Sequence, residues 1–301
     1  MSGVVSRRQL LQGAAVTTAA AASTAAAATL PQSWGDALDS LLQSHFRQMS
    51  SEEVQQALRR IEREVQRRYQ VSVHCQATAA QPGVVFGYAL NLSRCVGARR
   101  CVEACVRENN CPEDGHTQYI RVVSQDRDNR TLEGADHYFQ PRQVPEQGRW
   151  YLPVQCQQCA DPPCVQACPV QATWREPDGV VVIDYDWCIG CRYCAVACPY
   201  WARRFNWQQP ELTADQINPE LHYLGNRPRS AGVMEKCTFC IQRTRQGKLP
   251  ACQEACPSGA RVFGNLLDEQ GELRYILTHK TVFRLKEDLA THPSFWYFTD
   301  P

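Results

Sequence analysis

The sequence lacks an excess of charge of either sign, because its 301 residues contain 32 lysines and arginines against 31 aspartates and glutamates. This balance excludes the strongly basic surface that nucleic-acid or anionic-membrane binding requires. Beyond residue 30 the sequence also lacks an apolar run near the ~18 residues that a membrane helix needs. We therefore expect a soluble mature protein, built as one medium-sized domain or two small ones.

Motifs of common enzyme classes are missing as well. The sequence has no glycine-rich phosphate loop, no Rossmann fingerprint and no Ser-His-Asp set. Its seven histidines are scattered, with no pair at the i, i+4 spacing of a helical metal site. We therefore expect neither a substrate pocket nor a catalytic residue in this chain.

Cysteine, by contrast, is abundant, with 17 in the chain. A secreted disulfide scaffold is one interpretation, but disulfide partners seldom crowd four into eleven residues, whereas metal ligands do. Apart from Cys75 and Cys111, the cysteines fall into four groups. Groups one to four are, in order, Cys95, Cys101 and Cys105; Cys156, Cys159, Cys164 and Cys168; Cys188, Cys191, Cys194 and Cys198; and Cys237, Cys240, Cys252 and Cys256.

Group three has the spacing of a bacterial ferredoxin, C-x2-C-x2-C-x3-C, followed by Pro199. Three thiolates at this spacing hold one iron–sulfur cubane, and the fourth points to a neighbouring cluster. Groups two and four follow the same logic with a longer middle spacing. A single Cys-x2-Cys pair would also suit tetrahedral zinc, but a pattern repeated over four groups favours iron–sulfur clusters. The repeat predicts two fused two-cluster ferredoxin units.

Group one is an incomplete copy of this pattern. CVGARRC at residues 95–101 aligns with CIGCRYC at residues 188–194, and Ala98 then stands where group three has Cys191. The first group therefore lacks its central thiolate.

The N-terminus predicts export. The phrase SRRQLL at residues 6–11 contains the pair Arg7 and Arg8 and precedes an alanine-rich apolar stretch, with small residues at 25–28 that suit a signal peptidase. This pattern is typical of a twin-arginine (Tat) signal peptide, here residues 1–30. Twin-arginine export carries folded proteins, so we expect a periplasmic protein that receives its cofactors in the cytoplasm.

The remaining pattern predicts an α+β fold with short elements. Residues 36–70 read as helix, broken near Ser50, which forms a capping-box pattern with Glu53. The charged face of this helical extension suits solvent or, alternatively, a partner protein. The other predicted elements are strands at 119–123, 150–154 and 273–277, a hairpin of 173–175 with 180–183, a long surface loop at 206–232 and a short helix at 282–289.

Several phrases together resemble a known family. They are CVEACVRENN, CQQCADPPCVQACPVQAT, DYDWCIGCRYCAVACPYWARRFNW and EKCTFCIQR. The chain resembles the four-cluster, ferredoxin-like iron–sulfur subunits of the dimethyl-sulfoxide and polysulfide reductase type over residues 86–265, which leaves residues 266–301 as a C-terminal tail. The resemblance extends to exported, twin-arginine members that serve nitrite and sulfur respiration. One of these is the periplasmic subunit of the membrane complex linked to dissimilatory sulfite reductase.

In that family, groups one and four pair, groups two and three pair, and each group gives its last cysteine to its partner. The resemblance thus implies four candidate sites. Site I is Cys168, Cys188, Cys191 and Cys194; site II is Cys156, Cys159, Cys164 and Cys198; site III is Cys105, Cys237, Cys240 and Cys252; site IV is Cys95, Cys101 and Cys256. Sites I to III would each hold a [4Fe-4S] cluster.

Site IV has three possible outcomes because of Ala98. It holds a [3Fe-4S] cluster, as related ferredoxins with this lesion do. Alternatively, Cys75 or Cys111 supplies the missing ligand and a fourth cubane forms. Otherwise the site is empty or uses a ligand that is not cysteine.

The resemblance also implies a function. The chain is expected to be a non-catalytic electron-transfer subunit that connects a membrane quinone-reactive subunit with a redox partner, either a molybdopterin catalytic subunit or a cytochrome. The alternative is a free-standing periplasmic polyferredoxin, against which the helical extension and the long loops argue. Arg192, Arg203 and Arg204 either favour the reduced clusters or form ordinary surface salt bridges.

Overall fold

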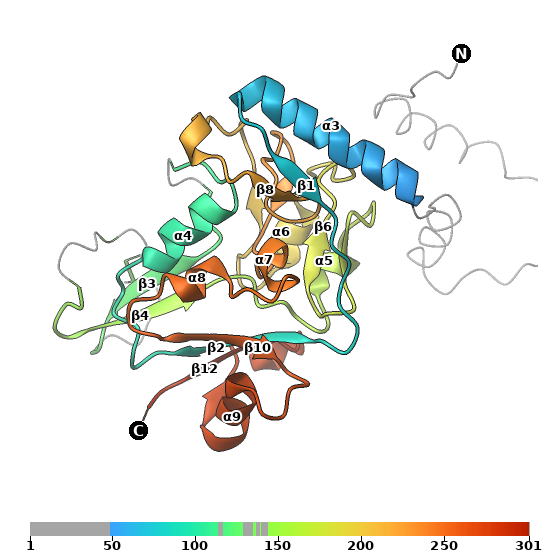
Figure 1. Cartoon of the computed structure of the whole chain (residues 1–301). Helices are drawn as coiled ribbons and strands as arrows, with labels where there is room; N and C mark the ends of the chain where they lie inside the picture. Colours follow the sequence, from blue (N-terminus) through green and yellow to red (C-terminus); the bar gives the residue numbers. More distant parts are fainter. Residues whose placement is uncertain (1–48, 114–116, 129–134, 137–138, 140–143, 301) are drawn as a thin grey trace, which may run out of the picture. The chain divides into compact units, whose positions relative to one another are not determined.

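The computed structural model describes residues 49–113, 117–128, 135–136, 139 and 144–300. The predicted signal peptide at residues 1–30 and the predicted first helix of the extension, up to residue 48, lie outside the described residues. The described chain mixes helices and strands, as the sequence predicts (Figure 1). None of its helices is long and apolar enough to cross a membrane.

Groups two and three lie on one small α/β arrangement, which we call the two–three module. It contains helix α5 (Pro163–Gln166), strands β5 (Thr173–Arg175) and β6 (Val181–Ile183), and helix α6 (Tyr193–Ala197). The strands pair antiparallel, with Thr173 opposite Ile183, and the two helices pack together. The predicted hairpin is therefore confirmed, and its turn contains Gly179 at φ +84°, a conformation that favours glycine.

Groups one and four lie on a second arrangement, the one–four module. Its elements are strand β2 (Phe86–Asn91), helix α4 (Arg100–Glu108), helix α8 (Ala251–Glu254) and strand β10 (Arg261–Asn265). Again the strands pair antiparallel and the helices pack against each other. In the two–three module α5 precedes β5, and β6 precedes α6. In the one–four module α8 precedes β10, and β2 precedes α4. Each module therefore contains one helix-to-strand half and one strand-to-helix half.

The two modules are joined by a buried ion pair. Asp178, in the turn of the two–three hairpin, is fully buried, and Arg245 follows helix α7 (Ile241–Thr244). The Arg245 Nε atom donates to the Asp178 carboxylate at 2.8 Å, and Nη1 donates to the Thr78 carbonyl at 2.7 Å. The backbone carbonyl of Asp178 also accepts from the N–H of Phe86, at the start of β2. This turn therefore fixes the two modules to each other.

The C-terminal segment is part of the one–four sheet. Strand β12 (Phe295–Phe298) pairs in parallel with β2, and β11 (Val282–Phe283) pairs with β12, so that the strand order is β10-β2-β12-β11. Helix α9 (Glu272–His279) covers the face of this sheet opposite α8 (Figure 1). The strand predicted at residues 273–277 is thus wrong, because Leu273 and Ile276 are buried at a helical spacing.

The short helix predicted at residues 282–289 is also wrong. These residues form the edge strand β11 and a single 3-10 turn, η4 (Glu287–Leu289). Val282 lies opposite Phe298 and Phe283 opposite Tyr297. Tertiary pairing with β12 therefore overrides the local preference of this segment.

Helix α3 (Ser51–Tyr69) confirms the predicted second helix of the extension. Its capping box is complete: the Ser50 hydroxyl accepts from the Glu53 N–H, and the Glu53 carboxylate accepts from the Ser50 N–H. The apolar face, including Ile61 and Val65, packs beside strand β1 (His74–Gln76). Strand β1 pairs in parallel with β8 (Glu220–His222), which ties the helix to the rest of the chain.

Residues 206–232 form only in part the surface loop that the sequence predicts, because more than half of residues 207–220 are exposed whereas most of residues 221–229 are buried. It contains η3 (Ala214–Gln216) and β8, and the side chains of Leu221, Asn226 and Arg229 are buried. The Asn226 amide donates to the carbonyls of Glu108 and Glu220, at 3.1 and 2.8 Å. Side-chain hydrogen bonds here satisfy the backbone in place of a regular ladder, which allows residues 221–229 to lie largely in the interior.

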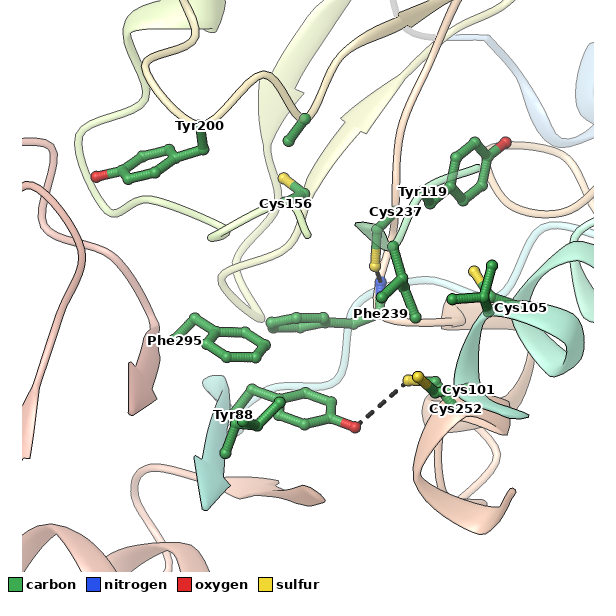
Figure 2. Close-up of a cluster of buried hydrophobic side chains, with 14 of the residues drawn as sticks. Tyr88, Cys101, Cys105, Tyr119, Cys156, Tyr200, Cys237, Phe239, Cys252 and Phe295 are labelled. Atoms are coloured by element: carbon green, nitrogen blue, oxygen red, sulfur yellow. Dashed lines mark hydrogen bonds between the residues drawn. The ribbon is translucent and has the colours of Figure 1, made fainter. Parts of the chain in front are cut away.

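The remaining strands complete the core. Strands β3 (Arg121–Asp126) and β4 (Arg149–Val154) pair antiparallel where the sequence predicts strands at 119–123 and 150–154. Strands β7 (Arg204–Phe205) and β9 (Met234–Glu235) form a short pair beside the two–three module. An aromatic cluster lies at the centre, where Tyr88 stacks on Phe295 at 4.9 Å between ring centroids (Figure 2).

Candidate metal centres

All four cysteine groups share one backbone feature. In each, the second residue after the first cysteine has a positive φ, between 46° and 73°. These residues are Gly97, Gln158, Gly190 and Phe239. The turn points a backbone N–H at the preceding sulfur, as when Phe239 N–H donates to Cys237 Sγ at 3.4 Å. Group one therefore keeps the loop conformation of the complete groups although it has Ala98.

The glycine in the group-one loop is required by packing, since groups two and four have Gln158 and Phe239 with a positive φ at the same position. A Cβ atom on Gly97 would lie 2.4 Å from the ring of Tyr151. In group three, a Cβ on Gly190 would lie 2.0 Å from the carbonyl oxygen of Gly232. In both copies a neighbouring group comes too close to the glycine for a Cβ atom to fit, a tyrosine ring in one and a backbone carbonyl in the other.

Site II surrounds a cavity. All four of its cysteines line a space of about 340 Å³, which includes its open mouth, together with Arg203 and Tyr200. Burial raises the pKa of Cys159 to about 12, and the neighbouring thiols of site II add to this effect. Four buried thiols around one space are unfavourable as separate thiolates, and binding to iron would neutralise them.

Site I lies directly beside site II. Burial raises the pKa of Cys194 to about 11, the Arg203 guanidinium opposes this, and Cys164, Cys188 and Cys168 raise it further. Cys191 is the one exposed cysteine among the described residues. The structure thus brings Cys168, from group two, to the cysteines of group three.

Site III is the most deeply buried set. Burial raises the pKa of Cys105 well above its usual value, and Cys237 and Cys240 contribute to the shift. Cys240 in turn interacts with Cys252 and Cys237. Figure 2 shows Cys105, Cys237 and Cys252 around the edge of the aromatic cluster. A cysteine of helix α4 therefore lies with three cysteines of group four.

Site IV also surrounds a cavity, of about 350 Å³ including its mouth. The cysteines that line it are Cys95, Cys101 and Cys256, and Ala98 contributes to the same wall. Burial raises the pKa of Cys95 to about 11, with Cys101 and Cys256 among the neighbouring groups that raise it.

Cys75 and Cys111 lie elsewhere. Cys75 is buried in β1 against helix α3, and its backbone N–H donates to Glu62. Cys111 is an electrostatic neighbour of Cys105 in site III. Neither belongs to the described residues that line the Ala98 cavity, so the structure brings no fourth cysteine to site IV.

These arrangements fit iron–sulfur clusters. Within the described ranges, no three His, Cys, Asp or Glu side chains converge closely enough to hold a single metal ion. The thiols of sites II and IV instead surround open spaces, and thiolate is the ligand that such clusters use.

Buried cations lie near the cysteine sulfurs, and sequence reasoning missed two of them, Arg261 and Lys236. Arg203 Nη2 donates to Cys164 Sγ at 2.9 Å, as expected for an arginine near a cluster. Arg261 and Lys236 have similar positions, described below. Two sequence features could have pointed to them. The phrase C-P-x-x-A-R occurs twice, ending at Arg203 and at Arg261, and Lys236 directly precedes Cys237.

The other two arginines considered from the sequence have different roles. The Arg192 guanidinium lies over the rings of Phe205 and Trp207, at 5.2 and 5.1 Å from their centroids. Arg204 donates to the backbone carbonyl of Gln118 at 3.0 Å.

Comparison with known proteins supports this chemistry. Residues 148–229 and 222–266 match the family model of the 4Fe-4S dicluster domain. The putative dimethyl sulfoxide reductase iron-sulfur subunit of Halobacterium salinarum is 39% identical over 219 residues, which cover 70% of this chain and 78% of the relative. A tetrathionate reductase subunit of Salmonella typhimurium is 35% identical over 214 residues, covering 70% of this chain and 71% of that protein. The menaquinone reductase iron-sulfur cluster-binding subunit of Nitratidesulfovibrio vulgaris is 34% identical over 236 residues, which cover 72% of this chain and 89% of that protein.

The chain belongs to this family of iron–sulfur subunits. The family predicted from the sequence is therefore confirmed. As an iron–sulfur subunit of the reductase type, the chain binds 4Fe-4S clusters and transfers electrons, and it is not the catalytic subunit.

Proposed function

We propose that this iron–sulfur subunit relays electrons along four clusters between a membrane quinone-reactive subunit and a redox partner of a respiratory complex. The partner is a molybdopterin catalytic subunit or a cytochrome. The names of the relatives support both ends of this path, since they include reductase subunits and a menaquinone reductase subunit. When bound, the clusters supply one-electron redox chemistry.

The observation that supports this proposal is that cysteines of successive candidate sites are neighbours. Cys194 of site I is an electrostatic neighbour of Cys164 of site II. Cys156 of site II and Cys237 of site III are likewise neighbours. Cys252 of site III is a neighbour of Cys101 of site IV. Sites I, II, III and IV thus follow one another, so that an electron could pass from each cluster to the next across the subunit.

The modules supply the scaffold for this row. We assign sites I and II to the two–three module and sites III and IV to the one–four module, each module being a two-cluster ferredoxin unit. In both, the last cysteine of each group serves the partner group. The repeated strand pairing and helix packing support this assignment.

Site IV is assigned a [3Fe-4S] cluster. Three thiols line its cavity, Ala98 occupies the position of the fourth, and Cys75 and Cys111 lie elsewhere. The loop around Ala98 keeps the φ values of a complete group, which supports a bound cluster rather than a collapsed site.

The protein is further proposed to be periplasmic, with residues 1–30 as a twin-arginine signal peptide and attachment to the membrane through its partners. The phrase SRRQLL supports this proposal.

The test is anaerobic purification of the native protein from solubilised membranes. A complex subunit elutes together with larger partners, whereas a free polyferredoxin carrier elutes alone at the size of a single chain, which is 34.0 kDa with its signal peptide. Iron and sulfide are then counted in the same fractions. Zinc in place of iron would overturn the relay, and elution as a free monomer would favour the carrier.

A further inference from the structure

Three cationic side chains are buried in the interior of the protein near cysteine sulfurs. Arg203 is 5% exposed, Arg261 is 3% exposed and Lys236 is fully buried. A buried charge is costly unless an opposite charge lies close to it. Each of these cations therefore requires a negative group nearby.

Arg203 lies between sites I and II. Its Nη2 atom donates to Cys164 Sγ of site II at 2.9 Å and to the Thr173 hydroxyl at 3.0 Å. Cys194 of site I is a second electrostatic partner. Its Nη1 atom is buried and has no hydrogen-bond partner among the described residues. Because Arg203 lines the cavity of site II, this donor is available to a group held there.

Arg261 lies in the same way between sites III and IV. Its Nη2 atom donates to Cys101 Sγ of site IV at 3.5 Å, and Nη1 lies 3.9 Å from Cys252 Sγ of site III. Nη1 also donates to the Gln155 side-chain oxygen at 2.8 Å. The two arginines end the two copies of C-P-x-x-A-R, so the one–four module repeats the placement found in the two–three module.

Lys236 lies at the remaining contact, between sites II and III. Its Nζ atom donates to the Cys237 carbonyl at 2.6 Å and to the Gln158 side-chain oxygen at 3.4 Å. Burial lowers the pKa of Lys236, whereas the nearby Cys156 of site II and Cys237 of site III raise it. Each contact between neighbouring sites in the row thus has one buried cation.

We propose that Arg203, Lys236 and Arg261 are junction cations, each of which favours the reduced state of both clusters that flank it. Reduction adds one negative charge to a cluster, and in a poorly polarisable interior a fixed cation offsets that charge effectively. Its attraction for the electron on each cluster offsets the repulsion between electrons on two neighbouring clusters. The row can then be reduced at several sites together. This inference rests on the proposed four-cluster relay.

The test uses the full-length holoprotein in anaerobic redox titrations followed by electron paramagnetic resonance. In Arg203→Gln, we expect the reduction equilibria of sites I and II to shift at least tenfold toward the oxidised state, which is 59 mV for a one-electron couple. Sites III and IV should keep their potentials. Arg261→Gln should give the complementary result and shift only the potentials of sites III and IV toward the oxidised state.

Two further variants separate charge from packing. Arg203→Lys keeps the charge and should shift sites I and II much less than Arg203→Gln. Arg192→Gln removes an exposed arginine beside Cys191, where water screens the charge, and should shift the potentials little. Unchanged potentials in Arg203→Gln, or equal shifts in its Lys and Gln variants, would overturn the junction role.

The iron content shows which proposal has failed. A native protein without iron would refute the relay itself. A fully loaded Arg203→Gln protein with native potentials would refute only the junction cations. If Arg203→Gln loses its iron, the potentials of Arg261→Gln and Arg203→Lys are measured instead. Native potentials in a fully loaded Arg261→Gln protein would then refute the junction cations.

Discussion

Restoring the missing cysteine of group one should convert site IV from a three-iron to a four-iron cluster. In Ala98→Cys, a fourth thiol joins the three that already line the cavity of about 350 Å³. Little rearrangement is needed, because Gly97 has φ 73° and its counterpart Gly190, before the real cysteine of group three, has φ 70°. The change therefore adds one iron to a site that is already shaped for a cluster.

The expected magnitude follows from the ligand count. Native protein should contain about fifteen irons, three cubanes plus one three-iron cluster, and Ala98→Cys should contain about sixteen. The oxidised three-iron cluster is paramagnetic, whereas oxidised low-potential cubanes are not. The variant should therefore lose the near-isotropic resonance of the mildly oxidised native protein, and the potential of site IV should fall.

The matched control is Ser93→Cys, which adds a thiol to an exposed position of the same segment outside the cavity. It should leave both the iron content and the resonance unchanged. The reasoning would be refuted by a native protein that already holds about sixteen irons without the resonance. It would also be refuted by an Ala98→Cys protein that is indistinguishable from native.

Three other outcomes are expected. Replacing both Arg7 and Arg8 by lysine should leave the protein in the cytoplasm with its clusters intact, measured by fractionation; normal periplasmic delivery would contradict the signal assignment. Cys159→Ser should give low yield and protease sensitivity because site II loses a ligand. Cys111→Ser, which removes no ligand of the four sites, should be tolerated. Equal yield and protease sensitivity of the two variants would count against the ligand set. Asp178→Asn removes the nearer counter-charge of the buried Arg245 guanidinium, at 2.8 Å, and leaves Glu176 at 3.4 Å. It should destabilise the protein by about 1–3 kcal/mol in denaturant titration, and an unchanged stability would be inconsistent with a buried pair.

The cysteine pattern predicted more of the site than of the surrounding fold. Ligand spacing is a local property, so the groups and the two–three hairpin can be read directly from the sequence. The exchange of Cys168 and Cys105 between groups, which the resemblance to the family implies, would be a tertiary feature that spacing alone does not reveal. The structure brings both cysteines to the groups expected, by burial and electrostatic contact.

The errors lie where tertiary contacts override local pattern. The segment at 206–232 has the composition of a surface loop, yet Arg229 is buried between the rings of Tyr119 and Tyr185 and pairs with Glu235. Its polar atoms replace a regular hydrogen-bond ladder, which composition does not reveal. The strand β11 depends on β12 for its pairing, so its own residues do not predict it.

The buried cations needed the structure for a related reason. An arginine or lysine in a sequence is most simply read as a surface residue. Arg261 and Lys236 are buried near thiols that come together only in the folded chain. The clusters proposed at these thiols would provide the opposite charge. The repeated phrase C-P-x-x-A-R is the sequence feature that could have indicated that Arg261 has the same position as Arg203.

The most direct test of the four-cluster row is anomalous diffraction at the iron absorption edge from crystals of the anaerobically purified holoprotein. We expect four iron centres in the order of sites I to IV, the last of them held by Cys95, Cys101 and Cys256 alone. Fewer than four centres, a different order along the row, or a fourth centre bound by Cys75 or Cys111 would contradict this account.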